Sequence, residues 1–124
     1  MRVRTARVIL PAMTTQPTQP TNPRLDVGDH GHSQDDLPDL DHGPLDLREY
    51  FGFAQAQPPR PLELEIGSGK GTFLVQQAGF QPATDFLGIE YARAFWRHAA
   101  DRCRRRALKN VRVLWADATV FVRN

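Results

Sequence analysis

The stretch Leu62–Gly71, L-E-L-E-I-G-S-G-K-G, decides the fold of this chain. Three apolar residues alternate in it with two glutamates, which is the period of a β-strand, and Gly67, Gly69 and Gly71 follow without a spacer. Because glycine has no Cβ, these positions can take positive φ and let a ligand lie against the main chain. The first N–H groups of a following helix would point at the same space. We therefore expect a strand, a tight turn that faces a ligand, and a helix.

Three ligand motifs compete for this turn, and their spacing separates them. A dinucleotide fold needs G-x-G-x-x-G, but the third residue after Gly69 is Thr72. A P-loop needs an earlier glycine where this chain has Leu64, inside the strand. What remains is E-x-G-x-G-x-G, from Glu65 to Gly71, which resembles the first motif of S-adenosylmethionine-dependent methyltransferases. An ordinary glycine turn without a ligand is the alternative.

Length and charge set limits on the rest of the chain. Its 124 residues suit one small domain, and a hydrophobic content of 40% suits a soluble protein with a disordered portion. Residues 62–124 hold ten Lys and Arg against six acids, whereas residues 1–61 hold six against eight. An anionic partner should therefore meet the second half.

The sequence favours a cytoplasmic protein without a membrane segment. No run approaches the roughly 18 apolar residues of a membrane span. The start M-R-V-R-T-A-R-V-I-L-P has too short an apolar run for a secretory signal. Cys103 is the single cysteine and cannot form an internal disulfide, which agrees with a reducing compartment.

The amino-terminal third lacks the residues of a packed core. Thr14–Pro23 is rich in proline and polar residues, and Asp26–Asp46 carries seven aspartates without Lys or Arg. We expect residues 1–44 to be a disordered tail and linker, and residues 45–124 to belong to the folded domain. Histidines in this linker could bind a divalent metal weakly, but no spacing fixes a coordination geometry, so we predict no metal site.

The second half reads as alternating strands and helices. Leu45–Phe53 concentrates aromatic residues and predicts a short helix or turn packed on the sheet. After the glycine turn, Thr72–Phe80 predicts a helix, Asp85–Glu90 a second strand, Tyr91–Ala107 a long helix and Val111–Asp117 a third strand.

Two of these strands end in an acid. Glu90 follows Gly71 by nineteen residues, where a Rossmann-like fold binds ribose through a carboxylate. The alternative is an acid that interacts with the dipole of the next helix. Asp117 could accept a bond from the exocyclic amine of adenine, and Ala118 leaves room for the ring.

The long helix is rich in arginine. Its basic residues could contact RNA phosphates, although a solvated basic face is an equal alternative. The candidate RNA-binding residues are Arg102, Arg104, Arg105, Arg106 and Lys109.

Three segments together carry a family resemblance. L-E-I-G-S-G-K-G, F-L-G-I-E and L-K-N-V-R-V-L-W-A-D-A, in this order and spacing, resemble the amino-terminal half of the tRNA (guanine-N(7))-methyltransferases, from Leu45 to about Val122. The resemblance implies an α/β, Rossmann-like methyltransferase fold, here partial, with three parallel strands in the order 3-2-1 and flanking helices. It also implies S-adenosylmethionine as methyl donor and a guanine in the variable loop of tRNA as acceptor.

The resemblance also implies a set of cofactor-binding residues. By motif match, Glu90 holds the ribose and Asp117 the adenine. The full set is Glu65, Gly67, Gly69, Gly71, Glu90, Asp117 and Ala118.

The chain departs from the family at Asn124. There the family continues with F-P-D-P-W and K-R-H-H-K-R-type segments, so we interpret the chain as a fragment whose catalytic residue is expected beyond Asn124. Alone it should bind cofactor weakly and should not methylate. A different Rossmann-like methyltransferase and a non-catalytic interaction module remain alternatives, and the oligomeric state stays open.

Overall fold

The computed structural model describes residues 2–5, 25–39, 43 and 45–119, with only the backbone for residues 2–5. The described elements follow one another along the chain, and from residue 45 onward they alternate as the sequence predicts. They are β1 (Arg2–Thr5), η1 (Gly28–His30), β2 (Gly31–Ser33), η2 (Gln34–Asp36), α1 (Leu47–Tyr50), β3 (Leu62–Ile66), α2 (Thr72–Phe80), β4 (Asp85–Glu90), α3 (Arg93–Arg105) and β5 (Val111–Trp115).

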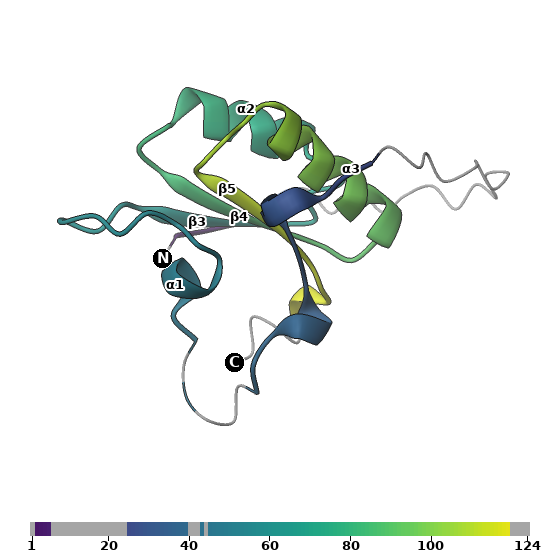
Figure 1. The fold of residues 1–124 in the computed structure, drawn as a ribbon, viewed down its shortest axis with the longest axis horizontal. Coiled ribbons are helices and arrows are strands. Elements are labelled where there is room, and N and C mark those ends of the chain that lie inside the picture. The colour runs from purple at the N-terminus through teal and green to yellow at the C-terminus, as the bar shows by residue number, and fades with distance from the viewer. Residues whose placement is uncertain (1, 6–24, 40–42, 44, 120–124) are drawn as a thin grey trace, which may run out of the picture.

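The described strands form one parallel sheet in the order β1-β3-β4-β5-β2 (Figure 1). Its centre pairs Leu64 with Leu87, and Leu87 with Arg112. The α/β class and the order of the three predicted strands are confirmed. The predicted number of strands is wrong, because the described part of the sheet contains five.

The two additional strands come from the amino-terminal part of the chain. β2 pairs with Val113–Trp115, and β1 pairs with β3. Backbone pairing needs no apolar alternation in the added strand, so these polar segments gave no strand signal.

Residues 25–39 have defined structure, which differs from the expected flexible linker. The Asp26 N–H donates to Oδ1 of Asp101 (3.1 Å), and Nε2 of His30 donates to the Leu108 carbonyl (2.7 Å). Both bonds span more than seventy residues of sequence. The order of this segment therefore depends on contacts that its local composition does not reveal.

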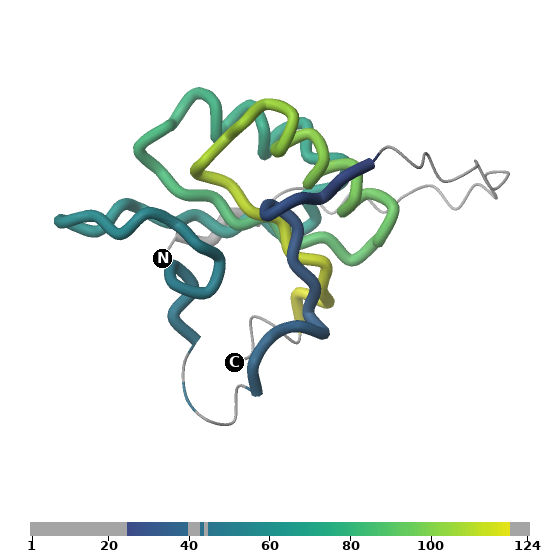
Figure 2. The backbone as a smooth tube through the Cα atoms, in the orientation of Figure 1, coloured from purple at the N-terminus to yellow at the C-terminus, as the bar shows by residue number. Residues whose placement is uncertain are grey.

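Helices α2 and α3 cover one face of the sheet, and α1 with the segment after it covers the other (Figures 1 and 2). On the first face, Trp96, Ala99 and Cys103 form the buried stripe of α3. On the second face, Phe51 and Phe53 pack against Leu64, Leu87 and Leu114, which confirms the predicted packing of Leu45–Phe53. Burial raises the pKa of the Cys103 thiol to about 12, so this thiol is protonated at neutral pH.

The described helices include none that is long and apolar enough to cross a membrane. The described residues also contain no group of three His, Cys, Asp or Glu that could hold a metal ion. Of the linker histidines, His30 and His32 bond to the carbonyls of Leu108 and Asp29, and His42 lies outside the described residues.

Candidate functional site

The glycine turn after β3 has the backbone that the sequence predicts. Gly67, Gly69 and Gly71 have φ of 78°, 57° and 83°, which side chains other than glycine rarely adopt. The N–H groups of Gly67 and Ser68 donate to the Ile89 carbonyl (2.8 and 3.3 Å), so the turn closes onto the end of β4. An ideal Cβ on Gly67 or Gly69 would meet nothing within 4 Å. The main chain at these two glycines is therefore open to a ligand.

The third glycine has a different environment. A Cβ on Gly71 would lie 2.8 Å from the Cβ of Ala99, so Gly71 lets the start of α2 pack tightly on α3. Glu65 is also buried, in β3 behind the turn, where its carbonyl accepts a bond from the Ser68 hydroxyl (3.3 Å). Gly71 thus serves the packing of α2 on α3, and Glu65 lies buried in the strand directly before the turn.

Glu90 lies directly against the glycine turn. Its Oε2 accepts the Gly69 N–H (3.0 Å) and its Oε1 accepts the Ala92 N–H (3.4 Å). The side chain is only 8% exposed. A carboxylate offers about four lone-pair positions, so two backbone bonds leave acceptor capacity for a ligand. The end of β4 and the glycine turn therefore form one site.

Asp117 lies at the same edge of the sheet. Glu90 pairs with Trp115, and the Ala116 N–H donates to the Glu90 carbonyl (3.1 Å), so Asp117 follows just past the end of β5. Oδ1 of Asp117 accepts bonds from the Thr119 hydroxyl (2.7 Å) and N–H (2.9 Å). These two bonds hold the pKa of Asp117 below its usual range. The carboxylate therefore stays ionised and can still accept further bonds.

The amino-terminal segment reaches this edge through a residue that the sequence did not reveal. Oε1 of Gln34 accepts the Asp117 N–H (3.0 Å). Gln34 lies far from the motifs in sequence, and no local pattern marks it. Ala118, next to Asp117, packs against the buried cluster on the α1 side of the sheet.

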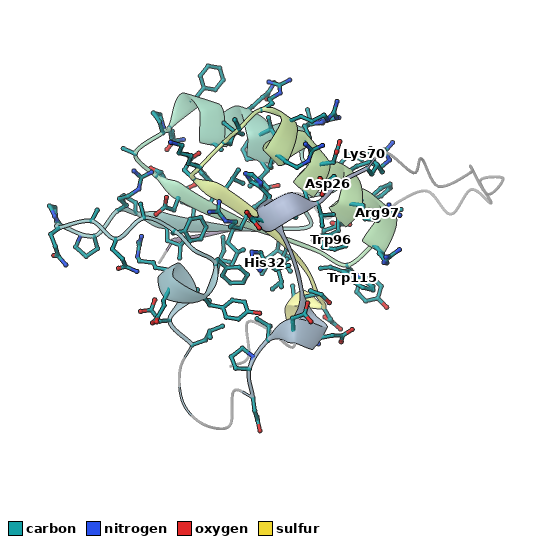
Figure 3. The ribbon with its side chains drawn as sticks, in the orientation of Figure 1. Asp26, His32, Lys70, Trp96, Arg97 and Trp115 are labelled. Carbon is teal, nitrogen blue, oxygen red and sulfur yellow. The ribbon has the colours of Figure 1, made fainter. Side chains whose placement is uncertain are left out.

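A rim of aromatic and basic residues, also not predicted, borders the edge. Trp115 stacks on Trp96 with ring centroids 5.7 Å apart, and Arg93 lies 5.5 Å from the Trp115 ring (Figure 3). The Trp115 indole N–H donates to the carbonyl of Tyr91 (3.0 Å), whose side chain is 76% exposed. The sequence could have indicated this rim, because Tyr91 follows directly after Glu90, the acid that ends β4.

The chemistry of this edge fits S-adenosylmethionine. Gly67 and Gly69 leave open space beside the main chain, and the Glu90 carboxylate adjoins that space. A second ionised carboxylate, Asp117, lies past the neighbouring strand. Ribose hydroxyls and the adenine amine are donors that such carboxylates accept.

The candidate RNA-binding residues at the end of α3 differ in their partners. Arg104 Nη2 and Arg105 Nε contact the Asp101 carboxylate at 2.9 and 2.8 Å. Burial raises the pKa of Asp101, but bonds from the Asp26 N–H and Arg104 together with the charge of Arg105 lower it overall. Arg102 instead donates to the Thr72 hydroxyl (2.8 Å) on the α2 side. Two members of the predicted cluster are therefore paired with a carboxylate, whereas Arg102 is not.

Comparison with known proteins agrees with this geometry. Residues 59–124, just over half of the chain, match a family model described as "Putative methyltransferase". The chain belongs to this methyltransferase family. It is 37% identical over 98 residues to a tRNA (guanine-N(7)-)-methyltransferase of Rhodopirellula baltica, covering 79% of this chain and 33% of that protein.

Two further relatives have the same name. The Thermosynechococcus vestitus protein is 41% identical over 66 residues, covering 53% of this chain and 31% of the relative. The Alkalilimnicola ehrlichii protein is 45% identical over 75 residues, covering 60% and 30%. The chain thus spans about a third of the length of the curated relatives that it matches.

Proposed function

We propose that this chain forms the cofactor-binding part of a cytoplasmic tRNA (guanine-N(7)-)-methyltransferase. Such an enzyme transfers a methyl group from S-adenosylmethionine to N7 of a variable-loop guanine in tRNA. The observation that carries the proposal is the bond between the Gly69 N–H and the Glu90 carboxylate, beside the open main chain of the glycine turn. The names of the curated relatives support the choice of tRNA as substrate.

Each residue of the edge has a separate task in this proposal. Glu90 accepts bonds from the ribose hydroxyls, and Asp117 accepts a bond from the adenine amine, with Ala118 leaving room for the ring. Gly67 and Gly69 let the ligand approach the main chain. Gly71 lets the start of α2 pack on α3, and Glu65, buried in β3 directly before the turn, completes the predicted set of cofactor residues. The cofactor, when bound, supplies an electrophilic methyl group on a sulfonium.

Methylation of the guanine acceptor requires little acid–base chemistry from the protein. N7 of guanine already presents a lone pair, so no strong base is needed to create the nucleophile. Positioning and electrostatic stabilisation then account for most of the rate enhancement. This role suits a rigid edge built from strand ends and backbone N–H groups.

Calorimetric titration with S-adenosylhomocysteine tests the proposal. The unaltered chain should bind, and Glu90→Gln should weaken binding by about 10-fold to 150-fold, because a charge-assisted hydrogen bond contributes about 1.5–3 kcal/mol. Asp117→Asn should weaken binding less, since the adenine amine makes a single bond there. Asp35→Asn removes an equal charge from an exposed position and should leave the affinity unchanged. Equal affinity of the Glu90→Gln and unaltered chains would overturn the proposal.

A further inference from the structure

A row of nitrogen-bearing side chains follows the α2 side of α3. His98, Arg102 and Arg106 are spaced four residues apart, so each step along the helix axis is about 6 Å. Lys70 extends the row by about one turn, since its Nζ lies 5.8 Å from the ring centroid of Phe95. The row therefore runs from the glycine turn, which carries Lys70 (labelled in Figure 3), to the far end of α3.

The three permanent cations of this row, Lys70, Arg102 and Arg106, make no ion pair with a carboxylate among the described residues. Helix α2, T-F-L-V-Q-Q-A-G-F, contains no charged residue, and Arg102 donates to the neutral Thr72 hydroxyl (2.8 Å). Lys70 and Arg106 are exposed and make no ion pair within the described part of the chain. Burial, followed by the charges of Lys70 and Arg102, lowers the pKa of His98, and the nearby Asp101 carboxylate opposes this only in part.

The other arginines near the end of the same helix are neutralised. Asp101 binds both Arg104 and Arg105, and Arg104 also donates to the Asp26 carbonyl (2.9 Å). An anion that approaches these two arginines must compete with a carboxylate already in place, whereas Lys70, Arg102 and Arg106 make no such ion pair. The two groups of cations should therefore differ in their affinity for phosphate.

We propose that Lys70, Arg102 and Arg106, with His98 between them, form a contact surface for the phosphate backbone of RNA. The inference rests on the proposed function, because it takes tRNA as the polyanion. Regularly spaced cations that lack carboxylate partners suit a phosphodiester strand, whose charges also repeat at regular intervals. Neutralising each phosphate releases a condensed counterion and makes the affinity depend on salt.

Two charge-matched triple variants test the proposal. The row variant is Lys70→Gln/Arg102→Gln/Arg106→Gln. The control variant is Arg97→Gln/Arg105→Gln/Lys109→Gln, which removes three positive charges outside the row. Fluorescence anisotropy with an unmodified tRNA transcript, repeated at several salt concentrations, gives the affinity and the slope of log K against log [salt].

The row variant should bind at least 10-fold more weakly, with a slope smaller by about 2–3, because each phosphate contact contributes about 0.7–0.9. The control variant should lose less than threefold, with a slope change below about 1. Equal losses in both variants, or no binding of tRNA by the unaltered chain, would overturn the proposal.

Two further measurements keep the outcome interpretable. If the row variant fails to fold in a thermal melt, Arg106→Gln alone replaces it, and its slope should fall by about 0.7–0.9. S-adenosylhomocysteine binding by the unaltered chain is measured separately. Binding of that nucleoside together with an unaffected row variant refutes the row and leaves the proposed function standing, whereas absence of that binding refutes the proposed function.

Discussion

The two ends of strand β4 each carry a buried carboxylate, and the two carboxylates have opposite surroundings. At the start of the strand, Asp85 is 1% exposed and contacts two guanidinium groups, Arg48 Nη1 at 3.0 Å and Arg60 Nε at 3.1 Å. At the end of the strand, Glu90 accepts bonds from the N–H groups of Gly69 and Ala92 beside open space. An acid held by permanent cations is committed to the fold, whereas an acid held by backbone N–H groups can still take a ligand.

Strand β5 repeats this contrast. Just before it begins, the buried Asn110 donates through Nδ2 to the carbonyls of Ala78, Gln81 and Thr84 at 2.9–3.1 Å. After it ends, Asp117 accepts bonds from Thr119 alone among the described residues. The amino edge of the sheet is thus closed by its own side chains, and the carboxyl edge is left with spare acceptors.

The largest loss of stability should come from removing the Asp85 carboxylate at the amino edge of the sheet. Asp85→Ala leaves Arg48 and Arg60 without their shared carboxylate, and we expect the free energy of unfolding to fall by about 3 kcal/mol. Urea denaturation measures the loss. The exposed Glu49→Gln should change the stability by less than about 0.5 kcal/mol. A loss below about 1 kcal/mol for Asp85→Ala would show that this ion-pair cluster does not hold the amino edge.

A smaller loss of stability should follow from adding a Cβ where the glycine turn packs against α3. In Gly71→Ala the new Cβ would meet Ala99 while the residue keeps a φ of 83°, so we expect about 2 kcal/mol of destabilisation in urea denaturation. The matched control is Gly79→Ala in α2, where a Cβ meets nothing within 4 Å and alanine should stabilise the helix by about 0.5–1 kcal/mol. Equal stabilities of the two variants would contradict the tight contact.

The central strands could be predicted from sequence because their signals are local. Alternation marked Leu62–Ile66, and the acids that end Asp85–Glu90 and follow Val111–Trp115 were placed correctly at one edge, since parallel neighbours share their carboxyl ends. β2 could not be predicted in this way. Its pairing depends on the backbone of β5 and on anchors such as Asp26 to Asp101, which no window of sequence contains.

The site and the basic surface show the same limit. Glycine spacing predicted the open turn, but the packing of Gly71 on Ala99 and the bond from Asp117 to Gln34 required the folded chain. The sequence marked Arg104 and Arg105 as candidate RNA-binding residues, yet it could not show that Asp101 neutralises them. The roles of the cofactor residues and the boundary of the domain at residue 45 stay predictions.

The smallest effect concerns the titration of Asp117 at the carboxyl edge of the sheet. Bonds from Thr119 depress the pKa of Asp117, so the stability that they contribute is fully present above the unfolded pKa and is lost as pH falls through the lower folded value. Thr119→Val removes the hydroxyl donor, so the pKa of Asp117 should rise toward its ordinary value. The loss of stability still begins at the unfolded pKa, but it should be smaller and end at a higher pH. Carboxyl ¹³C NMR titration measures this pKa, with Thr84→Val as control. An unchanged pKa in Thr119→Val would contradict the assigned bond.

The comparison between the two edges is tested most directly by amide NMR during titration with S-adenosylhomocysteine. We predict that the largest shifts occur at the carboxyl edge, at the amides of Gly67, Gly69, Ala92 and Asp117. The amides of Asp85 and Asn110 at the amino edge should stay unmoved. Shifts concentrated at Asp85 and Asn110, or no shifts at saturating ligand, would contradict the account.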